Sequence, residues 1–169
     1  QIIKVNNLLQ LKALKEELNQ RVRYLTDGES NQLMAAIRTR DAELIEARER
    51  HNKHRQKRHR PTLPSKRDQR FGDRLAPMII LSLLTGIRRG ELFDIEWRDW
   101  DHNACTLLVR AEIAKSSKSR TIPLNTMATS CLENWQRGEH TSNYARIFPA
   151  DDGSRLNNVR KSFANLLLR

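Results

Sequence analysis

The chain has 169 residues, of which 38% are hydrophobic and 30% charged, a length that suits one core with a helical appendage. Its formal net charge of +11 favours a polyanionic partner, with nucleic acid as the first candidate and a merely soluble basic protein as the plainer alternative. Two cysteines are too few for a disulfide framework or a zinc site, no apolar run is long enough to cross a bilayer, and no signal peptide is seen. We therefore expect a cytoplasmic protein without membrane contacts.

Two helical patterns occupy the N-terminal part. Apolar residues recur at helical spacing through residues 2–18 and predict a helix that is either packed on the body or the end of an upstream domain. Thr26 and Glu29 then have the spacing of a capping box, in which each side chain bonds to the other's backbone amide. We expect the helix that begins there to continue through Ile45.

The composition changes between residues 48 and 74. The run from His51 to Arg60 contains no apolar side chain, and Pro61 and Pro64 then prevent a regular helix. Such a run buries too little surface to offset the entropy of ordering it, which predicts a flexible basic insertion. A solvated loop and a contact to the DNA backbone are equally good interpretations of it. The candidate contacts are Lys53, Arg55, Lys57 and Arg58.

A buried helix is predicted next. Residues 75–84 are apolar on all sides, with Pro77 tolerated in the first turn, and Gly86 stands where a helix ends with a positive φ. A second, short helix is expected over residues 90–97. Trp97 and Trp100 should pack in the core, and Asp99 and Asp101 should cap the turn into a sheet.

The second half of the chain predicts a small sheet and two further helices. Strands are expected at 106–110, 112–114 and 120–124, around a turn that carries Lys115 and Lys118. A helix over 126–136 should have Thr126 as N-cap and Met127, Cys131, Leu132 and Trp135 facing inward. Residues 147–149 should form a short buried extended segment, and an amphipathic helix should run over 154–169. The apolar face of that last helix comprises Leu156, Val159, Phe163, Leu166 and Leu167.

The turn between the two central helices is a candidate phosphate site. Arg88 precedes a helix start, where backbone amides and the helix dipole favour an anion, and a guanidinium can hold two phosphate oxygens at once. The plainer interpretation is an ion pair with Glu91 or Asp94. Arg89 is adjacent and is a candidate DNA contact or a solvent-facing residue.

The hairpin supplies a second cation. An ammonium at Lys115, held near a phosphate, can protonate a leaving 5′ oxygen that would otherwise depart as a poor alkoxide. Lys118 and Arg120 are better suited to plain contacts with the DNA backbone. A basic hairpin by itself is weak evidence, because many nucleic-acid-binding proteins carry one.

Three motifs in one order are far more specific than their parts. They are Thr-Gly-x-Arg-x-Gly-Glu-Leu at 85–92, Trp-x-Asp-x-Asp at 97–101 and Lys-x-x-Lys-Ser-Arg-Thr-x-Pro-Leu at 115–124. This series resembles the catalytic domain of the tyrosine recombinases, or phage integrases, from about residue 21 to residue 169. The resemblance implies a mainly α fold with a small antiparallel sheet. It also makes residues 1–20 a helical linker from an N-terminal DNA-binding domain that is absent here.

The same resemblance implies strand exchange in double-stranded DNA without metal or cofactor. The family forms a 3′-phosphotyrosyl intermediate and works as a tetramer on DNA. Its members are encoded by bacteria, or by phages and other mobile elements. Arg88 matches its first catalytic arginine, Lys115 its general acid, and Glu91 an acidic position that orients the site.

The departure from the family pattern concerns the nucleophile. The family's His-x-x-Arg motif and its nucleophilic tyrosine, which follow the hairpin, are not found before Arg169. Tyr24 and Tyr144 both stand too early in the order of motifs. We therefore expect a truncated, inactive catalytic domain. The alternatives are a non-catalytic DNA-binding protein that retains the recombinase fold, and a relative of type IB topoisomerases.

Overall fold

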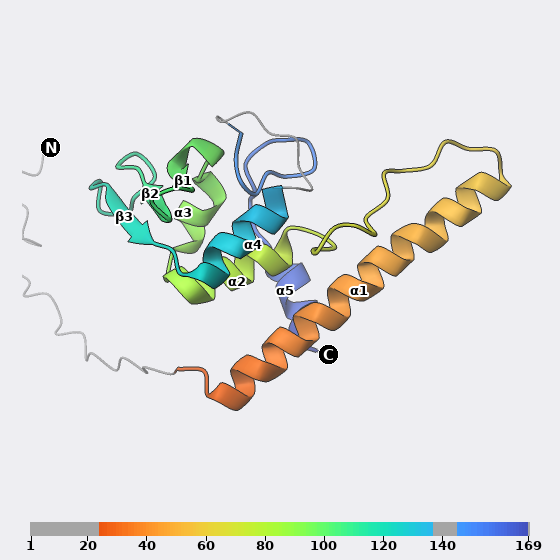
Figure 1. Ribbon diagram of the computed structural model, residues 1–169, viewed down its shortest axis with the longest axis horizontal. Helices are drawn as coiled ribbons and strands as arrows, with labels where there is room; N and C mark the ends of the chain where they lie inside the picture. Colours follow the sequence, from red (N-terminus) through yellow and green to blue (C-terminus); the bar gives the residue numbers. More distant parts are fainter. Residues whose placement is uncertain (1–23, 137–144, 169) are drawn as a thin grey trace, which may run out of the picture.

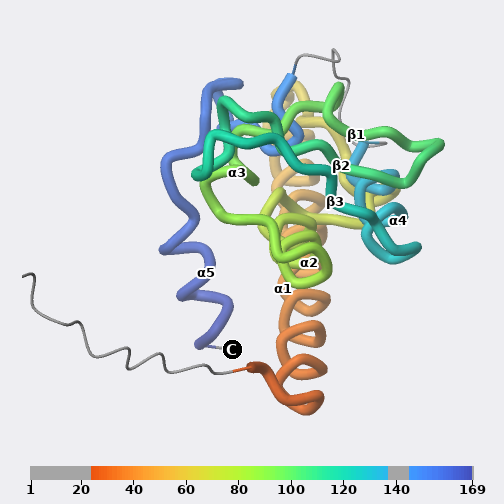
Figure 2. Tube along the Cα trace, turned by 90° about the vertical axis from the view of Figure 1, so that its left-hand side faces the viewer, coloured from red at the N-terminus to blue at the C-terminus, as the bar shows by residue number. Residues whose placement is uncertain are grey.

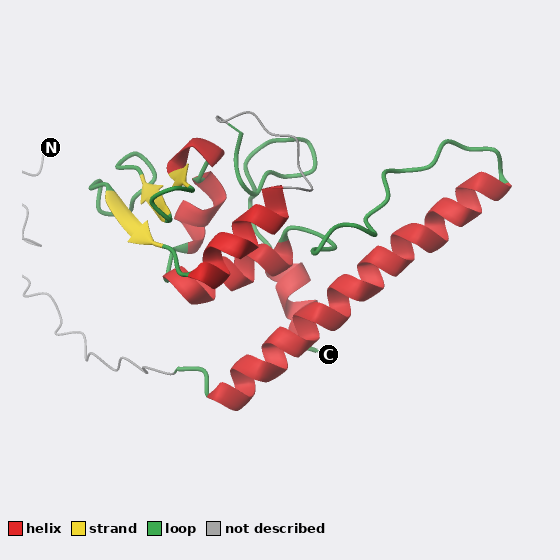
Figure 3. Ribbon diagram, viewed as in Figure 1, coloured by secondary structure: helices red, strands yellow, loops and turns green. Residues whose placement is uncertain are grey.

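The computed structural model describes residues 24–136 and 145–168. Figure 1 shows one very long helix that lies along a body of shorter helices, with a small sheet at the far side of that body; Figure 3 gives the same view by secondary structure. The helix predicted within residues 1–20 and the residue Tyr144 lie outside the described ranges. Within those ranges, no helix is both long and apolar enough to span a membrane.

The long helix α1 runs from Asp27 to Lys57 and begins at the predicted capping box. The Thr26 amide donates to Glu29 Oε2 at 2.9 Å, and the Glu29 amide donates to Thr26 Oγ1 at 3.2 Å. The prediction that a flexible insertion begins at residue 48 is wrong for residues 48–57, which are helical. The basic residues in the last turn interact favourably with the negative end of the helix dipole. Two hydrogen bonds between Asn52 on α1 and Leu63 on the returning chain also stabilise this end of the helix.

Helix α2, Leu75–Thr85, is the central element, as predicted. It packs against α4, Thr126–Gln136, and Leu81 on α2 is fully buried together with Leu132 on α4. Gly86 ends α2 with a φ of 63°, a left-handed conformation that glycine adopts without strain. Figure 2 shows α2 in front of α1 in this view, with the sheet above it.

The sheet has three short antiparallel strands in the order β1-β2-β3. They are β1, Trp100–Asp101; β2, Thr106–Val109; and β3, Arg120–Pro123, with Leu107 opposite Ile122. The strand predicted at 112–114 is wrong: Ile113 and Ala114 both donate to the carbonyl of Arg110, which folds this segment into turns. Side-chain alternation over three residues does not outweigh such local bonding.

The entry to the sheet follows the prediction closely. A single 3-10 turn, η2, spans Trp97–Asp99. Trp97 is buried and Trp100 is partly buried, with their rings 6.0 Å apart. Asp99 accepts from the Glu96 amide and Asp101 from the Ala104 amide, each at 2.9 Å, so both carboxylates cap turns here.

The two C-terminal helices differ from the prediction at their ends. Asn125, and not Thr126, caps α4, because its Oδ1 accepts from the Ala128 amide at 2.9 Å. Met127 is 62% exposed and does not face inward, while Cys131 and Trp135 do. The predicted helix over 154–169 is confined to α5, Arg160–Leu167. On its predicted apolar face Leu156 and Leu166 are buried, whereas Phe163 and Leu167 are exposed.

The extended segment at 147–148 is buried as predicted, and it is bonded on one side to α4 and on the other to the chain just before η2. The Trp135 indole N–H donates to the Ile147 carbonyl at 2.6 Å, and Arg146 pairs with Glu96 in an isolated bridge. Helix α5 then returns alongside α1 (Figure 2). The fold is therefore mainly α with a small antiparallel sheet, which confirms the predicted class.

Candidate functional site

Arg88 lies where α2 ends and α3, Arg89–Asp94, begins. Its backbone N–H donates to Glu91 Oε2 at 3.0 Å and its Nη1 donates to Glu91 Oε1 at 3.1 Å. The ion pair with Glu91 that the sequence offers as the plainer interpretation is therefore formed. Yet the Arg88 side chain remains 56% exposed, so the guanidinium presents a large part of its surface to solvent.

Glu91 is the buried centre of this region. Its side chain is 2% exposed and also accepts hydrogen bonds from both terminal nitrogens of Arg120, at 2.8 and 2.6 Å. The hydrogen bonds from Arg120, together with those from the Arg88 amide and guanidinium, outweigh burial and hold the pKa of Glu91 at about 2. The carboxylate is therefore ionised at neutral pH and carries two guanidinium groups at once.

This carboxylate connects the helical turn to the hairpin. Arg120 is the first residue of β3, and Lys115 lies five residues earlier in the exposed connection that follows β2. Ser117, two residues after Lys115, has a positive φ of 51°, and its amide donates a hydrogen bond to the Ala114 carbonyl. The structure thus brings Arg88, Glu91 and Arg120 into contact. Lys115 stands on the loop that Arg120 anchors, within about 17 Å of chain from it.

The other predicted residues of this region occupy different positions. Arg89 is exposed at the start of α3, and Lys118 is exposed near the end of the hairpin connection. Arg120, predicted as a plain contact to the DNA backbone, directs its guanidinium onto Glu91. That bidentate pair raises the pKa of Arg120.

A second layer of ion pairs surrounds α3. Arg155 donates to both oxygens of Asp94, at 2.6 and 2.8 Å, and its guanidinium lies 5.8 Å from the centre of the Phe93 ring. Arg110 bonds to Asp99 at 2.9 Å. Local sequence reasoning misses these residues because Arg155 and Asp94 are 61 positions apart. Because Arg155 bonds to both oxygens of Asp94, the partner of Arg88 is Glu91 and not Asp94.

The four predicted contacts in the basic run are not part of this cluster. Lys53, Arg55 and Lys57 lie on the last turns of α1, and Arg58 follows them. In Figure 1 this end of α1 stands at one extreme of the molecule, and the sheet with its hairpin stands at the other. The structure therefore has two separate basic regions.

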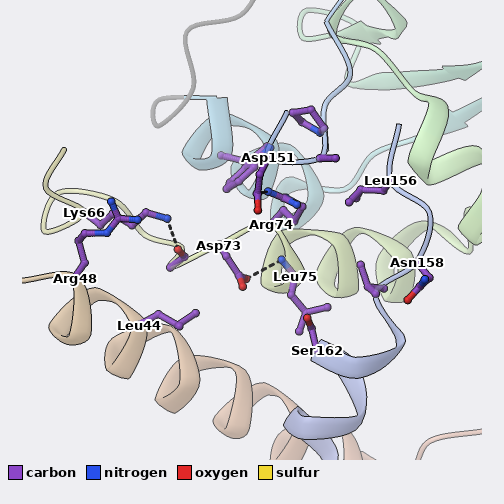
Figure 4. Close-up of a pocket in the computed structure, with 15 residues that line it drawn as sticks. Leu44, Arg48, Lys66, Asp73, Arg74, Leu75, Asp151, Leu156, Asn158 and Ser162 are labelled. Carbon is purple, nitrogen blue, oxygen red and sulfur yellow. Dashed lines mark hydrogen bonds and ion pairs between the residues drawn. The ribbon is translucent and has the colours of Figure 1, made fainter. Parts of the chain in front are cut away.

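A pocket of about 630 Å³ lies between these regions, where α1, the start of α2 and the approach to α5 meet. Figure 4 shows Lys66 directed at the Gly72 carbonyl and Asp73 accepting from the Leu75 amide, at 2.9 Å for the latter. Arg74 pairs with Asp151 across it. Its lining carries both signs of charge and does not include Arg88, Glu91 or Lys115.

Comparison with known proteins identifies relatives for most of the chain. The model of the phage integrase family matches residues 23–167. Tyrosine recombinase XerC of Xanthomonas axonopodis pv. citri is 32% identical over 69 residues, which cover 41% of this chain and 22% of that protein. XerC of Xanthomonas campestris pv. campestris is 30% identical over 86 residues, 51% of this chain and 26% of that protein.

Solved structures with the same fold agree with this match. The Tn1549 transposon integrase in complex with a circular intermediate DNA has a TM-score of 0.56 at 16% identity, over 96% of this chain and 50% of that one. The XerA recombinase has a TM-score of 0.51 at 16% identity, over 86% and 41%. The chain thus spans about a quarter of the curated relatives and half or less of the solved chains.

Proposed function

The chain belongs to the phage integrase family, and we propose that it forms part of a site-specific recombinase that breaks and rejoins duplex DNA through a 3′-phosphotyrosyl intermediate. The observation that carries this proposal is the shared carboxylate of Glu91. It ties the exposed Arg88 guanidinium to the strand that follows Lys115. One phosphodiester can then meet both cations.

Arg88 holds the non-bridging oxygens of the scissile phosphate in this proposal. Attack on a phosphodiester concentrates negative charge on these oxygens in the transition state, where a fixed, permanently charged guanidinium is most effective. The bonds to Glu91 use the Arg88 amide and one terminal nitrogen, and the exposed remainder of the group is available for DNA.

Lys115 acts as general acid. Its ammonium donates a proton to the departing 5′ oxygen, which would otherwise leave as an alkoxide. The position of Lys115 on an exposed turn lets it approach a bound duplex. Glu91 and Arg120 are positioning residues, because they act on the substrate only through the groups that they hold.

The attacking tyrosine is not assigned to this chain. Tyr24 is 82% exposed and precedes α1, and Tyr144 lies outside the described ranges. We propose double-stranded DNA and further copies of the protein, assembled on that DNA, as the partners. Arg89 and Lys118 are proposed contacts to neighbouring phosphates.

Binding to duplex DNA tests the role of Arg88. Affinity should fall steeply with salt, and Arg88→Ala should weaken it and reduce the log–log slope by about 1, because one phosphate contact is lost. Arg38→Ala, which removes an exposed arginine from α1, is the matched control and should change little. Equal effects of the two substitutions, or salt-independent binding, would contradict the proposal.

The coding sequence after the codon for Arg169 tests the chemistry. A downstream His-x-x-Arg motif and tyrosine would support the enzyme, and the complete product should then form a covalent complex with DNA that Arg88→Ala abolishes. A stop codon would instead support a DNA-binding protein that keeps the fold without the nucleophile.

A further inference from the structure

The end of α1 and the chain that returns from it form one basic projection, residues 48–67, which we call the basic arm. It contains nine lysines and arginines and one carboxylate, so these 20 residues carry +8 of the net charge of +11. Figure 1 shows the arm extending away from the rest of the molecule. A concentration of like charge of this size is costly unless an anion neutralises it.

The arm is held in shape by its own contacts. Asn52 on α1 is buried and makes two hydrogen bonds to Leu63 on the returning chain: its Nδ2 donates to the Leu63 carbonyl and its Oδ1 accepts from the Leu63 amide, each at 2.9 Å. Arg55 Nε donates to the Pro61 carbonyl at 2.5 Å. The two limbs of the arm are thus joined by bonds that the basic composition does not reveal.

The one carboxylate of the arm is also used internally. Glu49 accepts from Ser65 Oγ at 2.7 Å and lies 3.3 Å from Arg67 Nε, so it braces the returning chain. Lys53, Lys57 and Arg58 are exposed and, within the described ranges, form no ion pair. The internal bonds therefore order the arm while leaving its outer cations without a counter-charge.

We infer that the basic arm is a preformed docking element for the phosphates of duplex DNA, beyond those held at Arg88, and that one duplex reaches both regions. This inference rests on the proposed function. Helix α1 has 31 residues, which gives it a length of about 46 Å, comparable with about 14 base pairs of DNA. Because the arm is ordered before binding, little conformational entropy is lost when DNA docks.

The first experiment compares two triple variants with equal loss of charge. Lys53→Gln/Lys57→Gln/Arg58→Gln neutralises the arm, and Arg38→Gln/Arg160→Gln/Lys161→Gln removes exposed cations elsewhere. Fluorescence anisotropy is measured with duplexes of about 12 and 36 base pairs. We expect the arm variant to lose at least about tenfold in affinity for the longer duplex and its salt slope to fall by about 2 to 3. The control should lose less than about twofold.

The ratio of wild-type to variant affinity at each length tests the shared duplex, because the number of binding registers cancels in that ratio. A single duplex that spans both regions gives a larger ratio at 36 than at 12 base pairs. Equal ratios at the two lengths, or equal losses in arm and control variants, would overturn the inference. Stronger arm-dependent binding of single-stranded RNA than of duplex DNA would do the same.

Asn52→Ala tests whether the arm is preformed, since it keeps every charge. We expect a loss of affinity for the longer duplex that lies between those of wild type and the arm variant. Thermal unfolding of the body, followed by tryptophan fluorescence, checks that the fold is retained. Wild-type affinity in this variant would overturn the role given to Asn52. If the arm variant still loses affinity while Arg88→Ala changes nothing, the proposed active site is contradicted and the inference about the arm holds.

Discussion

Each of the two basic regions has a buried carboxylate at its base, and the pKa values of the two carboxylates are shifted in opposite directions. At the candidate site the guanidinium bonds hold the pKa of Glu91 at about 2. At the root of the arm, Asp41 on α1 is 5% exposed, and burial raises its pKa to about 6 despite a hydrogen bond from the Gly72 backbone. The bonds of the site converge on one buried negative charge, whereas the two limbs of the arm are joined by the neutral amide of Asn52 and by contacts of Arg55 and Glu49 nearer the surface.

In our proposal, the difference corresponds to two ways of presenting cations to DNA. Arg88 is positioned by a charged partner that also holds Arg120, which suits a group whose place must be defined to a fraction of an ångström. Lys53 and Lys57 project from the end of α1, which is stabilised by the hydrogen bonds between Asn52 and Leu63. This arrangement suits a high density of positive charge more than the exact placement of one group.

Loss of the Glu91 carboxylate should have the largest effect. Glu91→Ala removes the shared partner of Arg88 and Arg120, and we expect a loss of about 3 kcal/mol in unfolding free energy at pH 7, which matches the lowering of the Glu91 pKa from 4.5 to about 2. Denaturant unfolding followed by tryptophan fluorescence measures it. A loss below about 1 kcal/mol would show that the site is not held by this carboxylate.

The isosteric change Glu91→Gln sets the pH dependence. Because the folded-state pKa of Glu91 lies below its ordinary value of 4.5, its stabilising effect is present above pH 4.5 and lost as the pH falls towards 2. The difference in stability between wild type and Glu91→Gln should therefore be large at pH 7 and small near pH 2. A difference independent of pH would contradict the bonding described here.

Close packing at the root of the arm gives the next largest effect. A Cβ at Gly72 would lie 2.8 Å from Leu44 Cβ and 3.1 Å from the Asp41 carbonyl, so Gly72→Ala must push the returning chain off α1. We expect a loss of about 2 to 3 kcal/mol. Gly90→Ala, in α3 with nothing within 4 Å, is the control and should be neutral or stabilising by up to about 1 kcal/mol. Similar effects at both glycines would contradict the close approach.

Asp41→Asn should have a smaller effect, of opposite sign. Because the folded-state pKa of Asp41 is raised to about 6, the ionised form is disfavoured in the fold, and stability declines as the pH rises from about 4 to above 6. Removal of the charge should stabilise the protein by about 1 to 2 kcal/mol at pH 7 and leave it unchanged near pH 4. Destabilisation at pH 7 would show that Arg40, 3.4 Å away, pairs with Asp41 more strongly than burial opposes it.

Much of the fold is predictable because its signals are local. The capping box at Thr26 and Glu29, the left-handed Gly86 and the apolar α2 each depend on neighbours within a few positions, and each is found in the structure. The extension of α1 to Lys57 is not predictable in this way. It depends on Asn52 meeting Leu63, and composition alone indicates a loop there.

The candidate site divides in the same manner. Arg88 and Glu91 are three positions apart on one turn, so their pairing can be proposed from the sequence. The pairing of Arg120 with Glu91 across 29 positions, and of Arg155 with Asp94 across 61, depends on how the hairpin and the approach to α5 fold back onto α3. Arg120 consequently looks like a free DNA contact in the sequence and is a positioning residue in our proposal.

A double-mutant cycle on DNA affinity tests most directly whether Arg88 and Lys115 meet one phosphodiester. Affinities for the longer duplex are measured for Arg88→Ala, Lys115→Ala and the double variant, with Lys53→Ala replacing Lys115→Ala in a control cycle. Two cations on one phosphate should couple by at least about 0.5 kcal/mol, whereas Arg88 and Lys53 should be additive within about 0.3 to 0.5 kcal/mol. Additive losses for Arg88 and Lys115, equal to those of the control cycle, would show that the two cations serve different phosphates.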